Sequence, residues 1–476
     1  MVFNSFDFAV FLVLVWGMYA LMRGAGARRV MLLIMSLVFY GWWDWRFLPL
    51  IIGVSAMAWG AARLHQWAMG LGKPQAAAWA VRAGVGLPLF VLAFFKYALF
   101  MLDSSVSVFA VLGLRLPSPE ISILLPVGIS FYTFQALSYV IDVSRGRCAV
   151  ERSFWNVLLY ITFFPQLVAG PIVTAASFMP QLHTARVVTP ALFASGLRLV
   201  LWGLLLKVVF ADALATWADP IFAQPGGYTL AGRWLGVLAF SGQIYFDFAG
   251  YSTMAIGLGR TLGYSFPLNF DVPYRARNIT DFWRRWHISL SNWLRDYLFI
   301  PLGGNRQHFY RNLLLTMVLG GLWHGASWNF ILWGLLHGLA LITHKLWIKS
   351  SIQGQASTAG LTLSWLMTQA VVLVAWVPFR AADLKTTLWF FTANARSDAL
   401  TVPDCQITIA WLIVPLIVDG LLSRRITAEE APSPKTNAAP ADQRPALLTA
   451  LAYAALLLLI LALGTWESQT FLYFQF

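Results

Sequence analysis

The sequence predicts an all-α, polytopic integral membrane protein, and its composition, its apolar segments and the placement of its basic residues support this prediction. Of its 476 residues, 59% are hydrophobic and only 11% are charged, whereas about a quarter of the residues in a soluble domain carry charge. Many apolar runs approach the ~20 residues that a spanning helix needs. We therefore expect about 11–13 transmembrane or re-entrant helices.

The first apolar run, from Phe6 to Leu21, is followed by arginines and lacks a small-residue cleavage site. We expect it to remain in the protein as a helix whose N-terminus faces outward. Breaks are expected at Pro126 and Gly128, at FPQLVAGP (164–171) and at Gly320–Gly321, and such breaks are tolerated where they line a cavity. The later apolar runs lie near 30–43, 48–62, 82–102, 121–142, 154–172, 190–210, 234–259, 313–344, 361–379, 406–422 and 446–465.

The formal net charge of +13 is interpreted as membrane topology and not as nucleic-acid binding. The basic residues cluster in short loops between apolar runs, which is the pattern of loops kept on the cytoplasmic side. Residues 1–425 are predicted to form the helical core. Residues 426–445 contain four prolines and read as a flexible cytoplasmic linker. Residues 446–476 are then the last transmembrane helix and an aromatic tail on the outer side.

The polar residues concentrate between 278 and 338. Residues 278–298 alternate aromatic and basic side chains at helical spacing, which predicts an amphipathic interfacial helix in contact with anionic lipid, with Thr280 as N-cap. The apolar span 313–344 follows and contains His324 and His337. Ionisable residues at that depth are costly and suggest function.

His324 lies among glycines in GGLWHGASW, where a ligand could approach its ring. Neutral imidazole can accept a proton from an attacking hydroxyl, although a purely structural hydrogen-bonded histidine is an equal alternative from spacing alone. His337 is expected to be structural. Arg306 could bind a phosphate or serve only topology. Asp212 could orient a catalytic group or merely pair with Lys207.

Other chemistry is disfavoured, because no phosphate-binding loop, GxSxG elbow or HExxH helix occurs. Cys148 and Cys405 are interpreted as isolated small residues, and no metal or bound cofactor is expected.

The blocks DFWRRWHISLSNWLRDYLFIPLGGNRQ, GGLWHGASWNFILWG, LLPVGISFYTFQALSYVIDVSRG and QIYFDFAGYSTMAIGLG resemble the membrane-bound O-acyltransferase family. The similarity is greatest to its bacterial branch that acetylates alginate or cellulose, or alanylates teichoic acid. The resemblance implies helices around a central tunnel, with His324 and His287 as the characteristic histidines and Asp212 and Arg306 in the functional set. Trp323 and Asn329, beside the histidine block, are the further candidates for donor contact.

The resemblance further implies acetyl transfer from cytoplasmic acetyl-CoA across a bacterial inner membrane to a secreted exopolysaccharide. The expected partners are a periplasmic SGNH-type transferase or esterase and the polysaccharide synthase and secretion complex. The C-terminal FLYFQF resembles an aromatic motif of this branch, so Tyr473 is the candidate acetyl carrier, with an interfacial aromatic belt as the alternative. Two other functions stay open, namely a transporter or channel without bond chemistry and an acyltransferase for a protein or lipid.

Overall fold

The computed structural model describes residues 1–114, 122–184, 186–350, 357–392, 406, 408–413, 416–417, 420, 446–464 and 472. Every regular element within these residues is helical, which confirms the all-α class. The described residues fall into two compact units, Met1–Val187 with Leu262–Tyr264 and Val188–Thr261 with Ser265–Phe476. Five helical segments in this part of the chain are long and apolar enough to cross a membrane: Ala25–Gly70, Pro74–Val111, Pro190–Ala223, Trp328–Lys349 and Thr358–Arg380.

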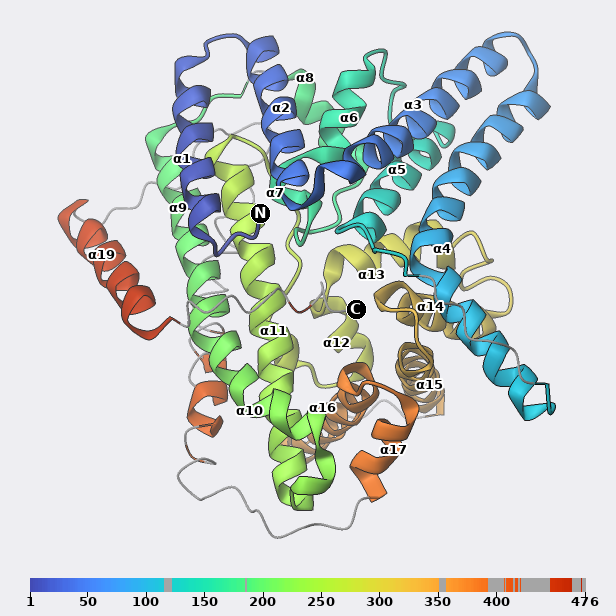
Figure 1. Cartoon of the computed structure of the whole chain (residues 1–476), viewed down its shortest axis with the longest axis vertical. Helices are drawn as coiled ribbons and strands as arrows, with labels where there is room; N and C mark the ends of the chain where they lie inside the picture. Colours follow the sequence, from blue (N-terminus) through green and yellow to red (C-terminus); the bar gives the residue numbers. More distant parts are fainter. Residues whose placement is uncertain are drawn as a thin grey trace. The chain divides into compact units, whose positions relative to one another are not determined.

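The first unit is built from eight labelled helices, and Figure 1 shows α3 and α4 as a long antiparallel hairpin within it. Large apolar side chains point outward from these helices, with Phe90 70% and Phe94 50% exposed. Such exposure would be unfavourable in water but suits contact with lipid. The helices are α1 (Phe6–Leu21), α2 (Ala25–Asp44), α3 (Leu48–Gly70), α4 (Pro74–Val111), α5 (Ile129–Ser144), α6 (Phe154–Thr162), α7 (Phe164–Leu167) and α8 (Ala175–His183).

Two of the predicted helix breaks in this unit are confirmed. Helix α5 begins directly after Gly128, whose φ of 73° lies in the left-handed region that glycine tolerates best. Helix α6 ends at Thr162, and only the short α7 follows before the chain turns toward α8. The apolar runs near 121–142 and 154–172 are therefore shorter helices than their hydrophobic lengths suggested.

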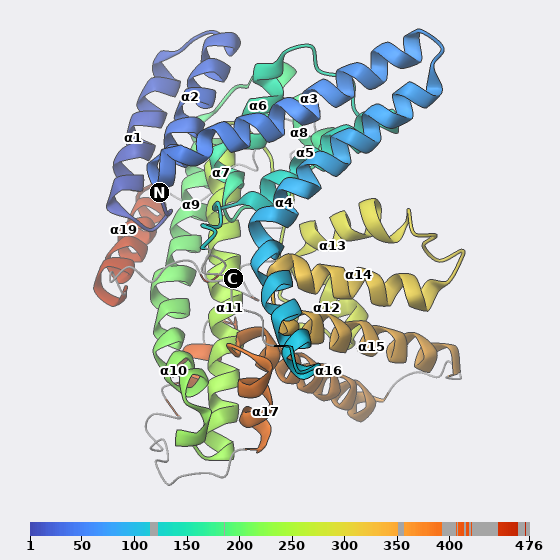
Figure 2. The ribbon, with the colours of Figure 1, turned by 45° about the vertical axis from the view of Figure 1, so that its right-hand side comes forward.

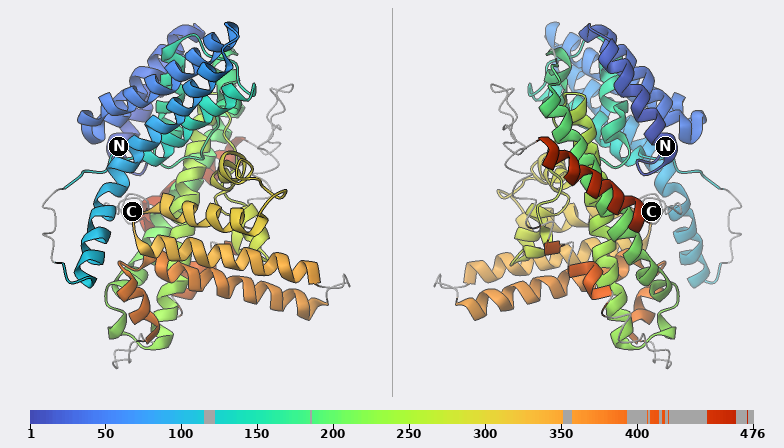
Figure 3. Two further views of the ribbon diagram at one scale, coloured as in Figure 1. Left: turned by 90° about the vertical axis from the view of Figure 1, so that its right-hand side faces the viewer. Right: turned by 90° about the vertical axis from the view of Figure 1, so that its left-hand side faces the viewer.

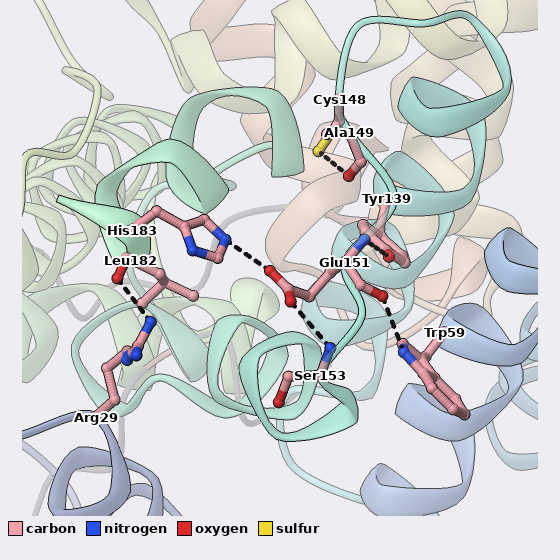
Figure 4. A network of polar contacts seen from close by, with 9 residues as sticks. All are labelled: Arg29, Trp59, Tyr139, Cys148, Ala149, Glu151, Ser153, Leu182 and His183. Atoms are coloured by element: carbon pink, nitrogen blue, oxygen red, sulfur yellow. Dashed lines mark hydrogen bonds and ion pairs between the residues drawn. The ribbon is translucent and has the colours of Figure 1, made fainter. Parts of the chain in front are cut away.

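A polar network around Glu151 fastens the connection between α5 and α6 (Figure 4). One carboxylate oxygen of Glu151 lies 2.6 Å from Nε2 of His183, and the other accepts the backbone N–H of Ser153. The Glu151 backbone N–H donates to the hydroxyl of Tyr139, while its carbonyl accepts the indole N–H of Trp59. This residue therefore joins helices α3, α5 and α8 through three of these bonds, and the fourth fixes its own loop.

The second unit contains the longest buried helix, α11, against which α9 packs along most of its length (Figure 1). Helix α19 lies beside α9 in the right-hand view of Figure 3. Helices α14 and α15 form an antiparallel pair, with α16 against α15 (Figure 2). The elements are α9 (Pro190–Leu205), a π-helical turn (Leu206–Ala211), α10 (Asp212–Ala223), α11 (Leu230–Thr261), α12 (Ile279–Arg285), α13 (Ile288–Leu294), α14 (Phe309–His324), α15 (Trp328–Ser350), α16 (Thr358–Arg380), α17 (Leu384–Thr392) and α19 (Ala446–Leu463).

The expected single helix over 278–298 is wrong. The chain forms α12 and α13, separated at His287, whose φ of 42° is left-handed. Asn278 caps α12 by accepting the N–H of Asp281 through its side chain, so Thr280 is not the N-cap. Phe282 and Trp286 are almost fully buried, which differs from residues lying in a headgroup layer. The apolar spacing therefore reflects two short helices packed inside the unit.

The span over 313–344 is interrupted, but not at the predicted position, because the chain turns back between α14 and α15 at 325–327. Gly320 and Gly321 lie inside α14 and do not break it. A Cβ atom on Gly321 would overlap the carbonyl of Phe330, so this glycine instead allows α15 to approach α14 closely. The linker 426–445 and Cys405 lie outside the described residues.

Candidate active site

His324 is the last residue of α14 and is only 4% exposed. Its ring centroid lies 5.0 Å from that of Trp333 and 5.3 Å from that of Phe379, both in near-perpendicular arrangements. Gly325 follows directly, and a Cβ there would overlap the ring of Phe330. The tight turn after α14 thus seats the imidazole inside an aromatic enclosure that leaves little room for water.

The buried histidines and tryptophans of the second unit form an alternating series of rings. Trp323 lies between His287 and His324, with centroid distances of 6.0 and 5.1 Å. Trp333 lies between His324 and His337, at 5.0 and 4.8 Å. The structure therefore brings together the two characteristic histidines and Trp323, which are separated by a helix break and a turn in the sequence.

Asn269 orients His287. Its Oδ1 is 3.0 Å from Nδ1 of His287 and also accepts the backbone N–H and the hydroxyl of Ser289. Its Nδ2 donates to the hydroxyl of Ser252. Because an amide oxygen can only accept, Nδ1 of His287 carries the hydrogen and Nε2 carries the lone pair.

The lone-pair nitrogen of His287 is buried, and among the described residues it has no hydrogen-bond partner. Burial lowers the pKa of His287 to about 3, because the surroundings cannot solvate the imidazolium form. The ring is therefore neutral at physiological pH. The backbone of His287 is left-handed, which is unusual for a residue other than glycine. Such strained conformations cluster at functional sites.

His337 has a different environment, and its contacts agree with the structural role expected of it. The indole N–H of Trp283 donates to its Nδ1 at 3.3 Å, and Phe282 stacks on the ring at 6.2 Å. These contacts tie α12 to α15. Helix α12 ends two residues before His287.

Asp212 does pair with Lys207, at 2.6 Å, but the pair belongs to a larger cluster. Lys207 also contacts Asp247 on α11 at 2.7 Å, and all three side chains are 3% exposed. The π-helical turn places Lys207 and Asp212, five residues apart, on one face, and the Asp212 N–H bonds to the Lys207 carbonyl. A Cβ on Gly203 would overlap the carbonyl of Gly250, so these glycines permit the close approach of α9 to α11.

The cluster contacts the C-terminal segment. The backbone N–H of Leu472 donates to Oδ2 of Asp247 at 2.9 Å, and Leu472 is 3% exposed. Tyr473 itself, together with Phe471, Phe474 and Phe476, lies outside the described residues. The chain thus comes to within one residue of the candidate tyrosine at a buried carboxylate.

The remaining candidates, Arg306 and Asn329, differ in their exposure. Arg306 is exposed in the turn before α14, and within the described part of the chain its guanidinium makes no hydrogen bond or ion pair. Asn329 is buried, where its Nδ2 donates to the carbonyl of Ala381 and its Oδ1 accepts from Thr387. The amide of Asn329 therefore links the start of α15 to Ala381 and to Thr387 of α17, and these contacts position α15.

Sequence reasoning missed Asn269 and Asp247. Asp247 lies in the block QIYFDFAGYSTMAIGLG, which indicated only the family, and Asn269 lies outside all four blocks; both have apolar neighbours in the sequence. A buried polar residue without a local partner is the signal that could have identified them, because such groups require a hydrogen-bond partner elsewhere in the fold.

Comparison with known proteins places these groups in a family. Residues 149–353, which include His287 and His324, match MBOAT, the membrane-bound O-acyltransferase family. The chain is 40% identical to a probable alginate O-acetylase of Azotobacter vinelandii, and the similarity covers 100% of both chains. The protein belongs to the MBOAT family.

Two further relatives are named as acyltransferases that act on other cell-wall polymers. A peptidoglycan O-acetyltransferase of Helicobacter pylori is 36% identical over 76% of this chain and 72% of its own length. A teichoic acid D-alanyltransferase of Bacillus subtilis is 28% identical over 47% of this chain and 60% of its own length. The protein is therefore a multi-pass membrane enzyme of the O-acyltransferase class, as the sequence predicted.

Proposed function

We propose that this MBOAT enzyme transfers acetyl groups from acetyl-CoA to a secreted exopolysaccharide, alginate or cellulose. The main support is the enclosed imidazole of His324 beside Trp323, whose ring also lies near that of His287, in a chain whose relatives with full-length similarity are named for alginate acetylation. A thioester is sufficiently activated to form an ester without ATP, and an enclosure with little water limits its hydrolysis. We place the enzyme in the bacterial inner membrane, with its N-terminus and C-terminal tail on the periplasmic side.

In the first step His324 acts as general base. It removes the proton of the Tyr473 phenol, and the phenolate oxygen attacks the carbonyl carbon of the thioester. The carbon–sulfur bond breaks, the proton returns to the leaving thiolate, and the products are acetyl-Tyr473 and free CoA. The phenol has an ordinary pKa of ~10 and so needs a base within hydrogen-bond reach. The burial of the neighbouring Leu472 supports entry of the tail into the protein.

In the second step the aryl ester passes its acetyl group to a periplasmic SGNH-type transferase or esterase, which hands it to the polysaccharide as it leaves the synthase and secretion complex. An aryl ester is more activated than a sugar ester, so this direction is downhill. His287 contributes its lone-pair Nε2 as a hydrogen-bond acceptor for a reacting hydroxyl. Asp212 acts through the cluster with Lys207.

Arg306 is proposed to hold a phosphate of the donor near the cytoplasmic mouth, since its guanidinium is exposed and makes no bond within the described chain. Trp323 would line the acyl path, and Asn329 would hold α15 in place for it. Arg306→Ala should raise the acetyl-CoA concentration needed for half-maximal transfer. Arg284→Ala removes another exposed arginine and should leave that concentration unchanged. The same half-maximal acetyl-CoA concentration in both variants would indicate that Arg306 serves only membrane topology.

The relay is tested by incubating purified full-length protein with acetyl-CoA and mapping modified peptides by mass spectrometry. We expect O-acetyl-Tyr473 in the wild type, and its loss in Tyr473→Phe and His324→Ala. His344→Ala replaces a partly exposed histidine of α15 that bonds to Thr280 and should retain the modification. Removing a general base costs about 10²–10⁴ in rate. If Tyr473→Phe acetylates polysaccharide as well as the wild type, the relay is refuted. If His324→Ala does so, the role of His324 as general base is refuted.

A further inference from the structure

One lysine and two aspartates are buried together inside the second unit, which is one carboxylate more than an ion pair needs. Lys207 and Asp212 alone would balance in charge, and Asp247 adds a second carboxylate to the same ammonium. With all three groups ionised the cluster carries one net negative charge at 3% exposure. Burying an excess charge is unfavourable unless other donors satisfy it.

The additional donor is the C-terminal segment. Asp247 divides its two oxygens, since Oδ1 faces Lys207 and Oδ2 accepts the backbone N–H of Leu472. The two residues are 225 positions apart, so no local structure imposes this bond. The Leu472 side chain is buried at the same place.

We propose that the Lys207, Asp212 and Asp247 cluster is an intramolecular receptor for the C-terminal segment. Asp247 accepts the hydrogen bond from the segment, and Lys207 fixes the orientation of Asp247. The buried side chain of Leu472 supplies apolar contact. Asp212 keeps one further buried oxygen, Oδ2, which has no hydrogen-bond partner among the described residues and is available to a second donor.

A backbone N–H as the recognised group makes the site sensitive to chain position more than to side-chain identity. The tether also favours docking. Helix α19 ends at Leu463 beside α9, and the eight Cα–Cα steps from Gly464 to Leu472 span at most about 28 Å when extended. A short tether keeps the effective concentration of the tail high, so a single charged hydrogen bond and one buried side chain suffice for occupancy.

The purpose of this docking, which is to present Tyr473 to the acyl donor, rests on the proposed function. The docking itself is testable without acetyl transfer. In full-length protein lacking its native cysteines (Cys148→Ser, Cys405→Ser), Gln475→Cys provides a reporter, and its reaction rate with a water-soluble maleimide is measured in detergent.

Two substitutions remove the bond from opposite sides. Leu472→Pro deletes the N–H donor in the tail and leaves the cluster intact, while Leu472→Ala keeps the donor. Asp247→Leu deletes the acceptor and leaves Lys207 paired with Asp212. We expect Leu472→Pro and Asp247→Leu each to raise the labelling rate about tenfold or more, and the double variant to show no further increase. Asp219→Leu, which breaks an ion pair with Arg380 elsewhere in the unit, should leave the rate unchanged.

Unchanged labelling in Leu472→Pro, or full additivity in the double variant, would overturn the docking proposal. Leu472→Pro keeps this test decisive even where Asp247→Leu does not fold. The outcomes also separate docking from the relay. Faster labelling in both variants without acetyl-Tyr473 in the wild type would support docking and refute the relay, whereas acetyl-Tyr473 with unchanged labelling would do the reverse.

Discussion

Replacing Lys207 with methionine should destabilise the protein far more than neutralising either aspartate. The ammonium lies 2.6 Å from Asp212 and 2.7 Å from Asp247, and all three side chains are 3% exposed. Lys207→Met therefore leaves two buried carboxylates without a cation. Asp247→Asn or Asp212→Asn instead leaves one balanced ion pair. The charge balance alone predicts this asymmetry.

Breaking a buried ion pair by removing one partner costs about 3–5 kcal/mol. An unfolding entropy of about 2.1 cal/mol/K per residue gives about 1 °C per kcal/mol for a chain of 476 residues, so the Tm of Lys207→Met should fall by roughly 3–5 °C. The assay heats full-length protein in detergent and measures the folded fraction by size-exclusion chromatography. Asp247→Asn should lose much less.

A triple variant, Lys207→Met with Asp212→Leu and Asp247→Leu, tests the same reasoning. Replacing a whole buried charge cluster by apolar residues is often neutral or stabilising. We expect the triple variant to recover most of the Tm that Lys207→Met loses. A Tm for Lys207→Met equal to that of Asp247→Asn, or no recovery in the triple variant, would refute the charge-balance argument.

Three further predictions concern other parts of the molecule. Asn269→Ala should cost about 2–6 kcal/mol, because it leaves two fixed buried donors unpaired, and should lower acyl transfer. Asn269→Asp keeps the acceptor oxygen but replaces the amide N–H with a buried acid, so it should restore only part of the stability and activity in thermal unfolding and transfer assays. Burial, with smaller contributions from nearby carboxylates, raises the pKa of Cys148 to about 11 from 9.0, so its maleimide labelling at pH 8 should be about a hundredfold slower than that of an ordinary thiol and should rise tenfold per pH unit; an ordinary rate would contradict the burial. Gly203→Ala should lower the free energy of unfolding by about 1–3 kcal/mol, because its Cβ would overlap the carbonyl of Gly250. Gly60→Ala has open space around it and should not lower the Tm, and equal Tm losses in the two variants would exclude close packing as the cause.

The helix breaks show how far local sequence patterns reach. Apolar spacing identified the helical regions, because a helix repeats its side-chain directions every 3.6 residues whatever it packs against. The same spacing could not distinguish one helix over 278–298 from α12 and α13. That break depends on the left-handed backbone of His287, whose ring is held by Asn269 from outside the segment.

The sequence by itself determined the membrane class, the helical architecture and the position of His324 in a glycine-flanked histidine block, since composition, periodicity and motif spacing are all local properties. Only the tertiary structure decided which polar groups meet. His287 and Asn269 are 18 residues apart, and Asp247 and Leu472 are 225 apart. Such pairs form because a buried donor or acceptor must find a partner wherever the folded chain provides one. Their choice depends on close helix approach at Gly203 and on a π-helical turn, neither of which has a local sequence signature.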